Sequence, residues 1–348
     1  MILHIMEESI LTGYAKVVSS KYPRWKPLSI LKLAITSLEQ SMASSEPAAL
    51  PFRYQLIAGA IAGVSEISTL YPLDVVKTRF QQQLLTTSKA AQYNGVIDCF
   101  KRIISEEGVG RLYRGMLSPV IVEAPKRAMK FASQQEFSKI ARELTKDNPN
   151  ISKQLTSVIT GICTGITEAM IVSSFELVKI RMQDRSNIGL YGSTGDCARK
   201  ILTQEGPVAF LRGLESAMWR NGSWNGAYFG MIHGIRTNLP LMKTENKKTA
   251  ETIRNFVAGT LGGILATTAN TPFDVVKTRI QSFIPRPGVQ PEYRWAIPGV
   301  IKIAKEEGIR GLYRGYVPKV LRLGPGGGIL LVVFDAVTSF LQKNKTLI

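Results

Sequence analysis

The sequence has few of the residues on which most metal sites and many catalytic sites depend. Only two histidines, His4 and His233, and three cysteines, Cys99, Cys163 and Cys197, occur among its 348 residues. The cysteines lack metal-ligand spacing, and their odd number provides no disulfide framework, so we expect all three to serve packing. Because His4 falls in an N-terminal tail, no zinc or two-histidine cluster can form. We therefore expect no cofactor and no metal.

Long apolar runs are also missing, and acidic residues are outnumbered. Lys plus Arg is 44 against 26 Asp plus Glu, which gives a formal net charge of +18. This balance fits a nucleic-acid binder, a membrane-surface protein or a protein that handles anions. No window of twenty residues is apolar throughout, although 45% of the chain is hydrophobic. That argues against a simple membrane bundle but allows a multi-pass protein whose helices line a water-filled interior.

A ten-residue charged motif, which we call the ladder, occurs three times. Each copy carries an acid, then a lysine three residues later, an arginine and a final glutamine: Pro72–Gln81, Ser174–Gln183 and Pro272–Gln281. The copies start 102 and 98 residues apart. Such a period predicts a threefold repeat. Three copies around one axis can close a ring of ion pairs, which is a gate.

Further features repeat in register with the ladder. A GxxxG-type segment lies thirteen residues before each ladder, at Gly59–Gly63, Gly161–Gly165 and Gly259–Gly263. This spacing lets helices approach closely in lipid. We expect a helix through each segment and ladder, kinked at Pro72 and Pro272. Ser174 replaces proline in the second copy, so the bend there should be weaker or differently made.

Each ladder is followed by a polar loop, a short amphipathic helix and a second long helix. The short helix is clearest over 96–107, and a Glu-Gly pair ends each copy, with glycine as the expected C′ residue. The second long helices begin after Arg-Gly pairs and run to about 142, 239 and 342, with Pro125 and Pro325 interrupting two of them. The pattern predicts an all-α protein with six long and three short helices.

The repeats divide the chain into an extension over 1–50 and three units over 51–146, 151–242 and 250–343. The extension has no secretory signal, and we expect it to be disordered. Its basic segment from Tyr14 to Lys32 faintly resembles a mitochondrial presequence, but Glu7 and Glu8 count against that. Met42 is a plausible alternative start.

Three copies of P-x-[DE]-x-x-K-x-R-x-Q, each followed by E-G-x-x-x-x-x-[KR]-G, resemble the mitochondrial carrier family over about residues 52–342. The resemblance implies a six-helix transmembrane barrel with pseudo-threefold symmetry in the mitochondrial inner membrane, and three short matrix helices. It also implies exchange of solutes by alternating access around one central site. Membrane lipid, including cardiolipin, is then a partner. One chain supplies all six helices, so a monomer suffices.

The resemblance also assigns gates. It pairs the acid of one ladder with the lysine of the next, as a matrix gate: Asp74 with Lys179, Glu176 with Lys277, and Asp274 with Lys77. The ladder glutamines Gln81, Gln183 and Gln281 should brace these pairs. On the cytoplasmic side only Arg236 and Asp335 match a pairing pattern. We therefore expect a weak cytoplasmic lock and a resting state open to the cytoplasm.

Matching the family's contact positions places the substrate site midway along the second long helices. The residues are Glu123, Lys126, Arg220, Asn221, Trp224 and Arg322, with Val122 beside them. Independently, Arg220 and Arg322 lie among apolar residues, where an unpaired cation is costly, and a guanidinium binds carboxylate bidentately. Together with Lys126 they suit a dicarboxylate. Glu123 is a partner for Lys126 in the empty site or a group for proton coupling.

Within the family the likeness is to the 2-oxodicarboxylate carriers, carried by the segments 123–128, 218–221 and 318–327. This implies exchange of 2-oxoadipate and 2-oxoglutarate. A carrier of another carboxylate, such as citrate or malate, is the nearest alternative. A basic peripheral nucleic-acid-binding protein is the alternative from another class, although it leaves the glycine segments unexplained. An enzyme is not expected, because no nucleophile–base set or cofactor loop occurs.

Overall fold

The computed structural model describes residues 52–83, 93, 95–146, 152–239, 247–285 and 288–343, and helices are the regular structure over these ranges. The extension predicted over 1–50 lies outside the described residues. Each repeat begins with one long helix: α3 (Phe52–Gln82), α6 (Lys153–Gln183) and α9 (Lys247–Ser282). Each also has a second: α5 (Leu117–Lys146), α8 (Leu214–Asn238) and α11 (Tyr316–Lys343). The predicted all-helical threefold repeat is confirmed.

A short helix follows the first long helix of each repeat. These are α4 (Val96–Arg102), which continues as a π-helical turn over Ile103–Glu107, α7 (Thr194–Gln204) and α10 (Ala296–Leu312). The glycine of each Glu-Gly pair has a positive φ: 84° at Gly108, 80° at Gly206 and 68° at Gly308. Only glycine adopts this conformation without strain, so the predicted C′ role is confirmed. In α10 the glycine interrupts a helix that resumes after it.

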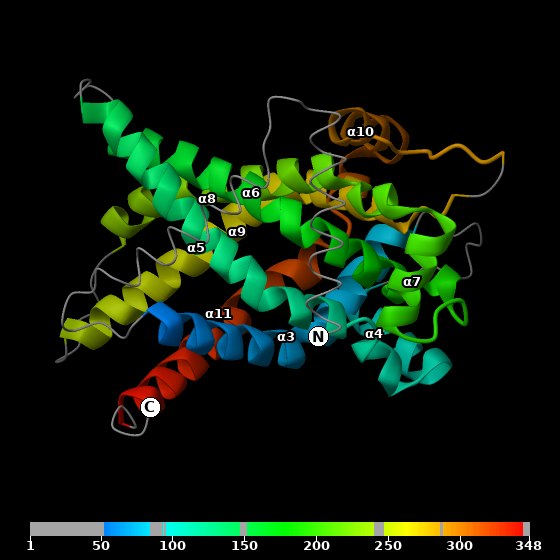
Figure 1. Cartoon of the computed structure of the whole chain (residues 1–348), viewed down its shortest axis with the longest axis horizontal. Coiled ribbons are helices and arrows are strands. Elements are labelled where there is room, and N and C mark those ends of the chain that lie inside the picture. The colour runs from blue at the N-terminus through cyan, green and yellow to red at the C-terminus, as the bar shows by residue number, and fades with distance from the viewer. Residues whose placement is uncertain are drawn as a thin grey trace.

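The six long helices form a closed ring. Each packs against its neighbours in chain order, and α11 packs back against α3. Figure 1 shows the short helices α4, α7 and α10 gathered at the right, whereas the outer ends of α5 and α11 lie far apart at the left. The ring is therefore narrow at the ladder end and spread at the other end.

Pro125 and Pro325 do not divide their long helices as the sequence suggested. Pro72, Pro125, Pro272 and Pro325 all lie inside uninterrupted helices. The prediction that Pro125 and Pro325 interrupt their helices was wrong. A proline removes one backbone donor, and packing against neighbouring helices keeps such a helix continuous.

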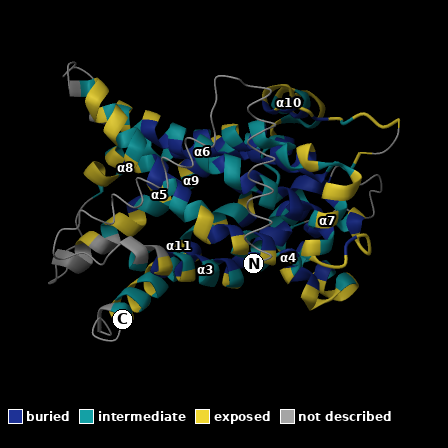
Figure 2. Ribbon diagram, viewed as in Figure 1, coloured by how far each residue is buried: buried dark blue, intermediate teal, exposed yellow. Residues whose placement is uncertain are grey.

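Buried residues are not distributed evenly between the two ends of the ring. Each ladder and its short helix share a small apolar core, such as Tyr71, Val75, Cys99 and Ile103 in the first repeat. Figure 2 shows the buried residues concentrated towards the end where the short helices lie. Large apolar side chains are exposed on all six long helices, among them Ile61, Phe131, Ile159, Trp219, Leu265 and Val332. An apolar outer surface of this extent indicates contact with lipid or protein.

Two helices pass a strict test of length and hydropathy for a membrane span within the described residues. They are Gln154–Gln183, with mean hydropathy 1.6, and Tyr316–Leu341, with 1.7. The other long helices carry more charged and polar side chains.

The glycine segments of the first two repeats make room for different contacts. A Cβ at Gly165 would lie 2.6 Å from the backbone oxygen of Asn221, which is the close helix approach that we expected. At Gly63 a Cβ would instead collide with the Glu123 carboxylate and, at 2.7 Å, with the Arg127 guanidinium. In the first repeat the glycines thus make room for a buried ion pair and not for another backbone.

Candidate functional site

The three ladders meet at the narrow end of the ring, where their acids and lysines pair. The three pairs are the ones expected from the family pattern: Lys179 with Asp74 at 2.8 Å, Lys77 with Asp274 at 2.7 Å, and Lys277 with Glu176 at 2.5 Å. The lysine side chains are 2–19% exposed. The pairs join helices from different repeats, so they close the ring of charges that the sequence predicted.

Each ladder acid also binds a cation from a second long helix. The Arg322 Nη1 lies 2.6 Å from Asp74 Oδ1, the Arg220 Nη1 lies 2.7 Å from Glu176 Oε1, and the Lys319 Nζ lies 3.1 Å from Asp274 Oδ2. Sequence reasoning placed Arg220 and Arg322 in the substrate site but overlooked Lys319. Its position inside a membrane-length helix was the available signal, because charges there are seldom without function.

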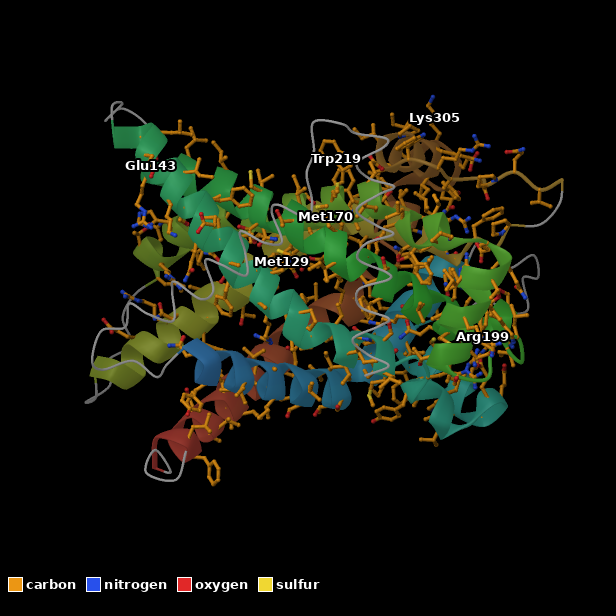
Figure 3. All side chains as sticks on the ribbon, viewed as in Figure 1. Met129, Glu143, Met170, Arg199, Trp219 and Lys305 are labelled. Atoms are coloured by element: carbon orange, nitrogen blue, oxygen red, sulfur yellow. The ribbon has the colours of Figure 1, made fainter. Side chains whose placement is uncertain are left out.

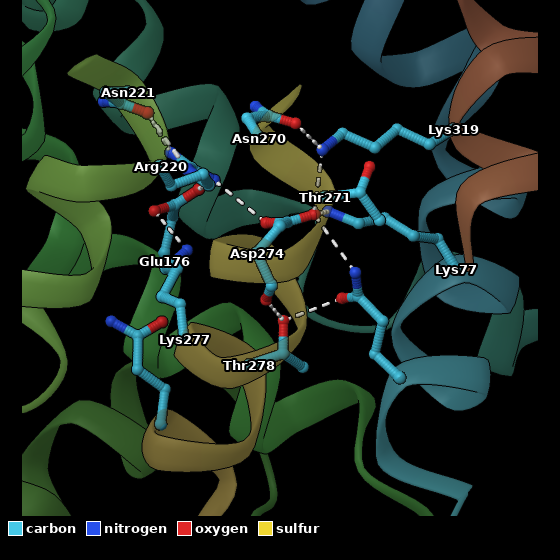
Figure 4. Close-up of polar contacts among 12 residues, drawn as sticks. Lys77, Glu176, Arg220, Asn221, Asn270, Thr271, Asp274, Lys277, Thr278 and Lys319 are labelled. Carbon is cyan, nitrogen blue, oxygen red and sulfur yellow. Dashed lines mark hydrogen bonds and ion pairs between the residues drawn. The ribbon is translucent and has the colours of Figure 1, made fainter. Parts of the chain in front are cut away.

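Asp274 has the richest set of partners among the ladder acids (Figure 4). Besides Lys77 and Lys319, it accepts a hydrogen bond from Gln81 Nε2 at 3.1 Å, and Arg220 Nη1 lies 3.6 Å away. Its side chain is 1% exposed, against 10% for Asp74 and 20% for Glu176. Asp274 is therefore the most enclosed of the three ladder acids.

Positive charge exceeds negative charge in this cluster. The three ladder pairs alone are neutral, and Arg220, Lys319 and Arg322 add three cations to the same three acids. One further acid joins them, because Glu66 Oε1 lies 2.9 Å from Arg322 Nη2. A partly exposed cluster with an excess of guanidinium and ammonium groups is suited to bind an anion.

The glutamine brace is present at one of its three predicted positions. Gln81 donates to Asp274 and accepts from Thr278 Oγ1 at 2.7 Å. Gln281 donates instead to Ser173 and to the backbone oxygen of Arg212, each at 3.2 Å. The structure gives Gln183 no hydrogen bond to Asp74 or Lys179. The expectation therefore fails at Gln183 and Gln281, and at Gln281 the competing acceptors on α6 and before α8 are the reason.

Glu123 and Lys126 form a separate cluster on α5. Glu123 is 2% exposed, pairs with Lys126, and accepts from Arg127 Nε at 2.7 Å. The expected Glu123–Lys126 pair is therefore present, and Arg127 shares the same carboxylate. Among the described residues no ion pair joins this cluster to Arg220 or Arg322. The predicted substrate residues thus fall into two groups.

Asn221 and Trp224 support their surroundings on α8. The Asn221 Oδ1 accepts from Arg220 Nε and Nη2 at 3.0 and 2.7 Å, which fixes the guanidinium beside Glu176. The Trp224 ring stacks on Tyr228 with centroids 5.0 Å apart, and Lys130 Nζ lies 6.0 Å from the Trp224 centroid. Asn221 therefore orients a candidate ligand-binding group, whereas Trp224 makes an aromatic contact within α8.

The predicted cytoplasmic lock does not form. Arg236 and Asp335 are both exposed, and no ion pair between them is present over the described residues. They lie towards the ends of α8 and α11, at the end of the ring opposite the ladders. Since this end is spread, the two charges do not meet.

A second threefold set of ion pairs binds the short helices to the ladders, and sequence reasoning overlooked it. The ladder arginines Arg79, Arg181 and Arg279 bind Glu107, Glu205 and Glu307, the glutamates of the Glu-Gly pairs, at 2.7, 2.9 and 2.9 Å. Burial opposes ionisation of Glu205, but the hydrogen bond and charge of Arg181 outweigh it and lower the pKa of that carboxyl. The repeated Arg and Glu were the signal for these pairs.

The fold and the site together define a class of protein: a threefold-repeated ring of long helices with an apolar outer surface and a charged, cation-rich interior. The family model described as mitochondrial carrier protein matches residues 48–144, 152–243 and 248–345. The chain belongs to the mitochondrial carrier family. It is a transporter and not an enzyme, and it is an integral protein of the mitochondrial inner membrane.

Curated relatives agree with this assignment. The chain is 47% identical over 302 residues to mitochondrial 2-oxodicarboxylate carrier 2 of Saccharomyces cerevisiae, covering 85% of this chain and 96% of the relative. It is 50% identical over 297 residues to mitochondrial citrate transporter D of Aspergillus niger, with 85% and 96% covered. It is 38% identical over 293 residues to the mitochondrial 2-oxodicarboxylate carrier of Homo sapiens, with 83% and 95% covered.

Proposed function

We propose that this chain is an antiporter that exchanges 2-oxodicarboxylates, such as 2-oxoadipate and 2-oxoglutarate, by alternating access. In this proposal the six long helices cross the membrane and the three short helices lie on the matrix side. The two helices of membrane-span hydropathy and the apolar outer faces of all six support the arrangement.

One observation carries the proposal: Arg220, Lys319 and Arg322 add three positive charges to a ladder ring that is otherwise neutral. Both arginines already hold a carboxylate, Glu176 or Asp74, through a guanidinium nitrogen. A substrate carboxylate offers the same chemistry as these side chains. It therefore competes with the ladder acids for the same cations.

This competition provides a route from binding to gate opening. When a dicarboxylate occupies Arg220 and Arg322, Glu176 and Asp74 each lose one of their two cationic partners. The ladder pairs that remain are partly shielded, and pairs of this kind contribute about 1 kcal/mol or somewhat more each. Ion pairs of such modest size can break and re-form in every transport cycle.

The conformation fits a carrier that is closed at the matrix side and open to the cytoplasm. The three ladder pairs are formed, whereas Arg236 and Asp335, both within the described residues, form no ion pair with each other and the opposite end of the ring is spread (Figure 1). This supports the expectation that the substrate-free carrier rests in the cytoplasm-open state.

Exchange in liposomes tests the proposal. The purified chain is reconstituted with internal 2-oxoadipate, and uptake of labelled 2-oxoglutarate is followed at neutral pH. We expect uptake that requires the internal substrate. Absence of this exchange in protein that still unfolds cooperatively would overturn the proposal.

Citrate is the second candidate substrate, because one relative of equal similarity is named a citrate transporter. The same liposomes, loaded with citrate, distinguish the two. If external citrate competes with 2-oxoglutarate more strongly than 2-oxoadipate does, the chain is a tricarboxylate carrier with the same mechanism.

A further inference from the structure

Glu66 on α3 is an acid that neither the ladder pattern nor the family contact positions singled out. It precedes Asp74 by eight residues, which is about two helical turns, so both carboxylates lie on one face of α3. Arg322 bridges them, with Nη2 at 2.9 Å from Glu66 Oε1 and Nη1 at 2.6 Å from Asp74 Oδ1. The Glu66 and Arg322 side chains are 21% and 27% exposed, so both remain accessible to a solute.

The glycines of α11 make the room that Glu66 occupies. Gly326 lies one turn beyond Arg322, and a Cβ there would approach Glu66 Oε1 to 3.1 Å and Leu70 Cδ1 to 3.3 Å. Gly324, one residue before Pro325, meets nothing within 4 Å. The glycine at position 326 is thus the one whose missing side chain admits the Glu66 carboxylate.

Comparison of the three repeats shows that an acid at the position of Glu66 is not present in all of them. The equivalent positions, six residues before each ladder, hold Glu66, Glu168 and Ala266. Glu168 lies within electrostatic range of Arg220, but within the described part of the chain no ion pair joins it to that arginine. Of the residues at these three equivalent positions, Glu66 is therefore the one that forms an ion pair with a cation of the proposed substrate site.

We propose that Glu66 determines the charge of the transported anion by occupying Arg322 and removing one unit of positive charge from the site. The inference rests on the proposed function in so far as the cluster binds carboxylates. A site with one fewer positive charge favours a dicarboxylate over a tricarboxylate, because the third carboxylate finds a repelling acid where a cation would otherwise be free.

The test is a charge-selectivity series on Glu66→Gln, which keeps the shape of the side chain and removes its charge. At neutral pH, kcat/KM is measured in liposomes for 2-oxoglutarate, with two negative charges, and for citrate, mostly with three. We expect the ratio of the citrate value to the 2-oxoglutarate value to rise about tenfold, an order of magnitude for one charge in a partly solvated site. Glu66→Asp, which restores the charge, should return the ratio towards that of the wild type.

Two further variants separate charge selection from damage to the fold. Gly326→Ala pushes the Glu66 carboxylate from Arg322 without changing any charge, and it should shift the ratio in the same direction by a smaller factor. Glu143→Gln makes the same charge change at the exposed outer end of α5 (Figure 3), and it should leave the ratio unchanged.

The outcomes are decisive for each hypothesis. If the ratio of the citrate value to the 2-oxoglutarate value is unchanged in Glu66→Gln, the role of Glu66 is overturned. An equal shift of this ratio in Glu168→Gln would overturn it as well, because the total charge of the site and not the position of Glu66 would then set the selectivity. If Glu66→Gln fails to transport, thermal stabilisation of the detergent-solubilised protein by each anion is measured instead, and it gives the ratio of the affinities for citrate and 2-oxoglutarate. If the wild type exchanges no 2-oxodicarboxylate, the proposed function fails. The stabilisation series still reports whether the preferred anion charge rises in Glu66→Gln.

Discussion

Replacing Asp274 with asparagine should destabilise the ladder ring more than any other single neutralisation of a ladder acid. Asp274 is 1% exposed and faces Lys77 at 2.7 Å, Lys319 at 3.1 Å and Arg220 at 3.6 Å. Asparagine keeps one acceptor oxygen, so part of the hydrogen bonding to neighbouring side chains remains. It removes the negative charge that compensates three cations. Breaking a buried pair from one side costs about 3–5 kcal/mol, and we take the lower value because the lysines are partly exposed.

The comparison variant is Glu176→Gln, because Glu176 holds two cations but is 20% exposed. The exposure of Glu176 and the second acid near Arg220, Asp274 at 3.6 Å, compensate part of the loss, so about 1–2 kcal/mol is expected although Lys277 is only 2% exposed. With roughly 2–4 °C for each kcal/mol in a large domain, Asp274→Asn should lower Tm by about 6–12 °C and Glu176→Gln by about 2–8 °C.

Thermal unfolding in detergent, followed with a thiol-reactive dye, measures both values. Cys99 and Cys197 are buried beneath the ladders and become reactive only on unfolding, and a Cys163→Ser background removes the remaining thiol. Adding Lys319→Gln to Asp274→Asn should recover part of the loss, because it removes one uncompensated cation. If Asp274→Asn unfolds no earlier than Glu176→Gln, the argument that the enclosure of each acid ranks the cost of neutralising it is wrong.

Three further predictions concern the site and the short helices. Arg322→Ala should abolish exchange of 2-oxoglutarate in liposomes, and Arg322→Lys should retain less than about a tenth, because an ammonium group cannot bridge two carboxylates as a guanidinium does. Burial raises the pKa of the Cys99 and Cys197 thiols to about 12, so both should resist alkylation at pH 8 in the folded protein, as mass spectrometry of labelled peptides would report. Glu205→Gln should lower Tm by about 4–8 °C at pH 7, since it removes the partner of buried Arg181. The Glu205 carboxyl has a lowered pKa in the folded protein, so its contribution is complete above the unfolded value of about 4.3 and is lost as pH falls through the folded pKa. The Tm difference between wild type and Glu205→Gln should therefore shrink in acid, and a difference that persists there would refute the assignment.

The threefold repeat was predictable because the motifs that define it are short segments of sequence. The ladder, the Glu-Gly pair and the Arg-Gly pair recur in register, and each has a local structural meaning that does not depend on the rest of the chain. The positive φ at Gly108, Gly206 and Gly308 is one such feature. The pairing of ladder acids with lysines of other repeats came from the family resemblance, and the structure contains all three of these ion pairs.

Details that depend on which side chains compete for one group were not predictable. Gln281 matches Gln81 in the motif, yet it binds Ser173 and Arg212 because acceptors on neighbouring helices lie nearer. The glycine segment at Gly59–Gly63 resembles the other two, yet it encloses Glu123 and Arg127. Identical motifs therefore acquired different contacts from different neighbours.

The sequence by itself determined the repeat, the helices and the family, since all of these arise from residues a few positions apart that recur at a fixed period. Only the tertiary structure decided that Arg220, Lys319 and Arg322 bind the ladder acids, and that Glu66 shares Arg322 with Asp74. Positions 66 and 322 are far apart in the chain, and their contact exists only because α11 closes the ring against α3. The physical reason is that charge compensation inside a ring of helices depends on distances across the ring, which no local pattern records.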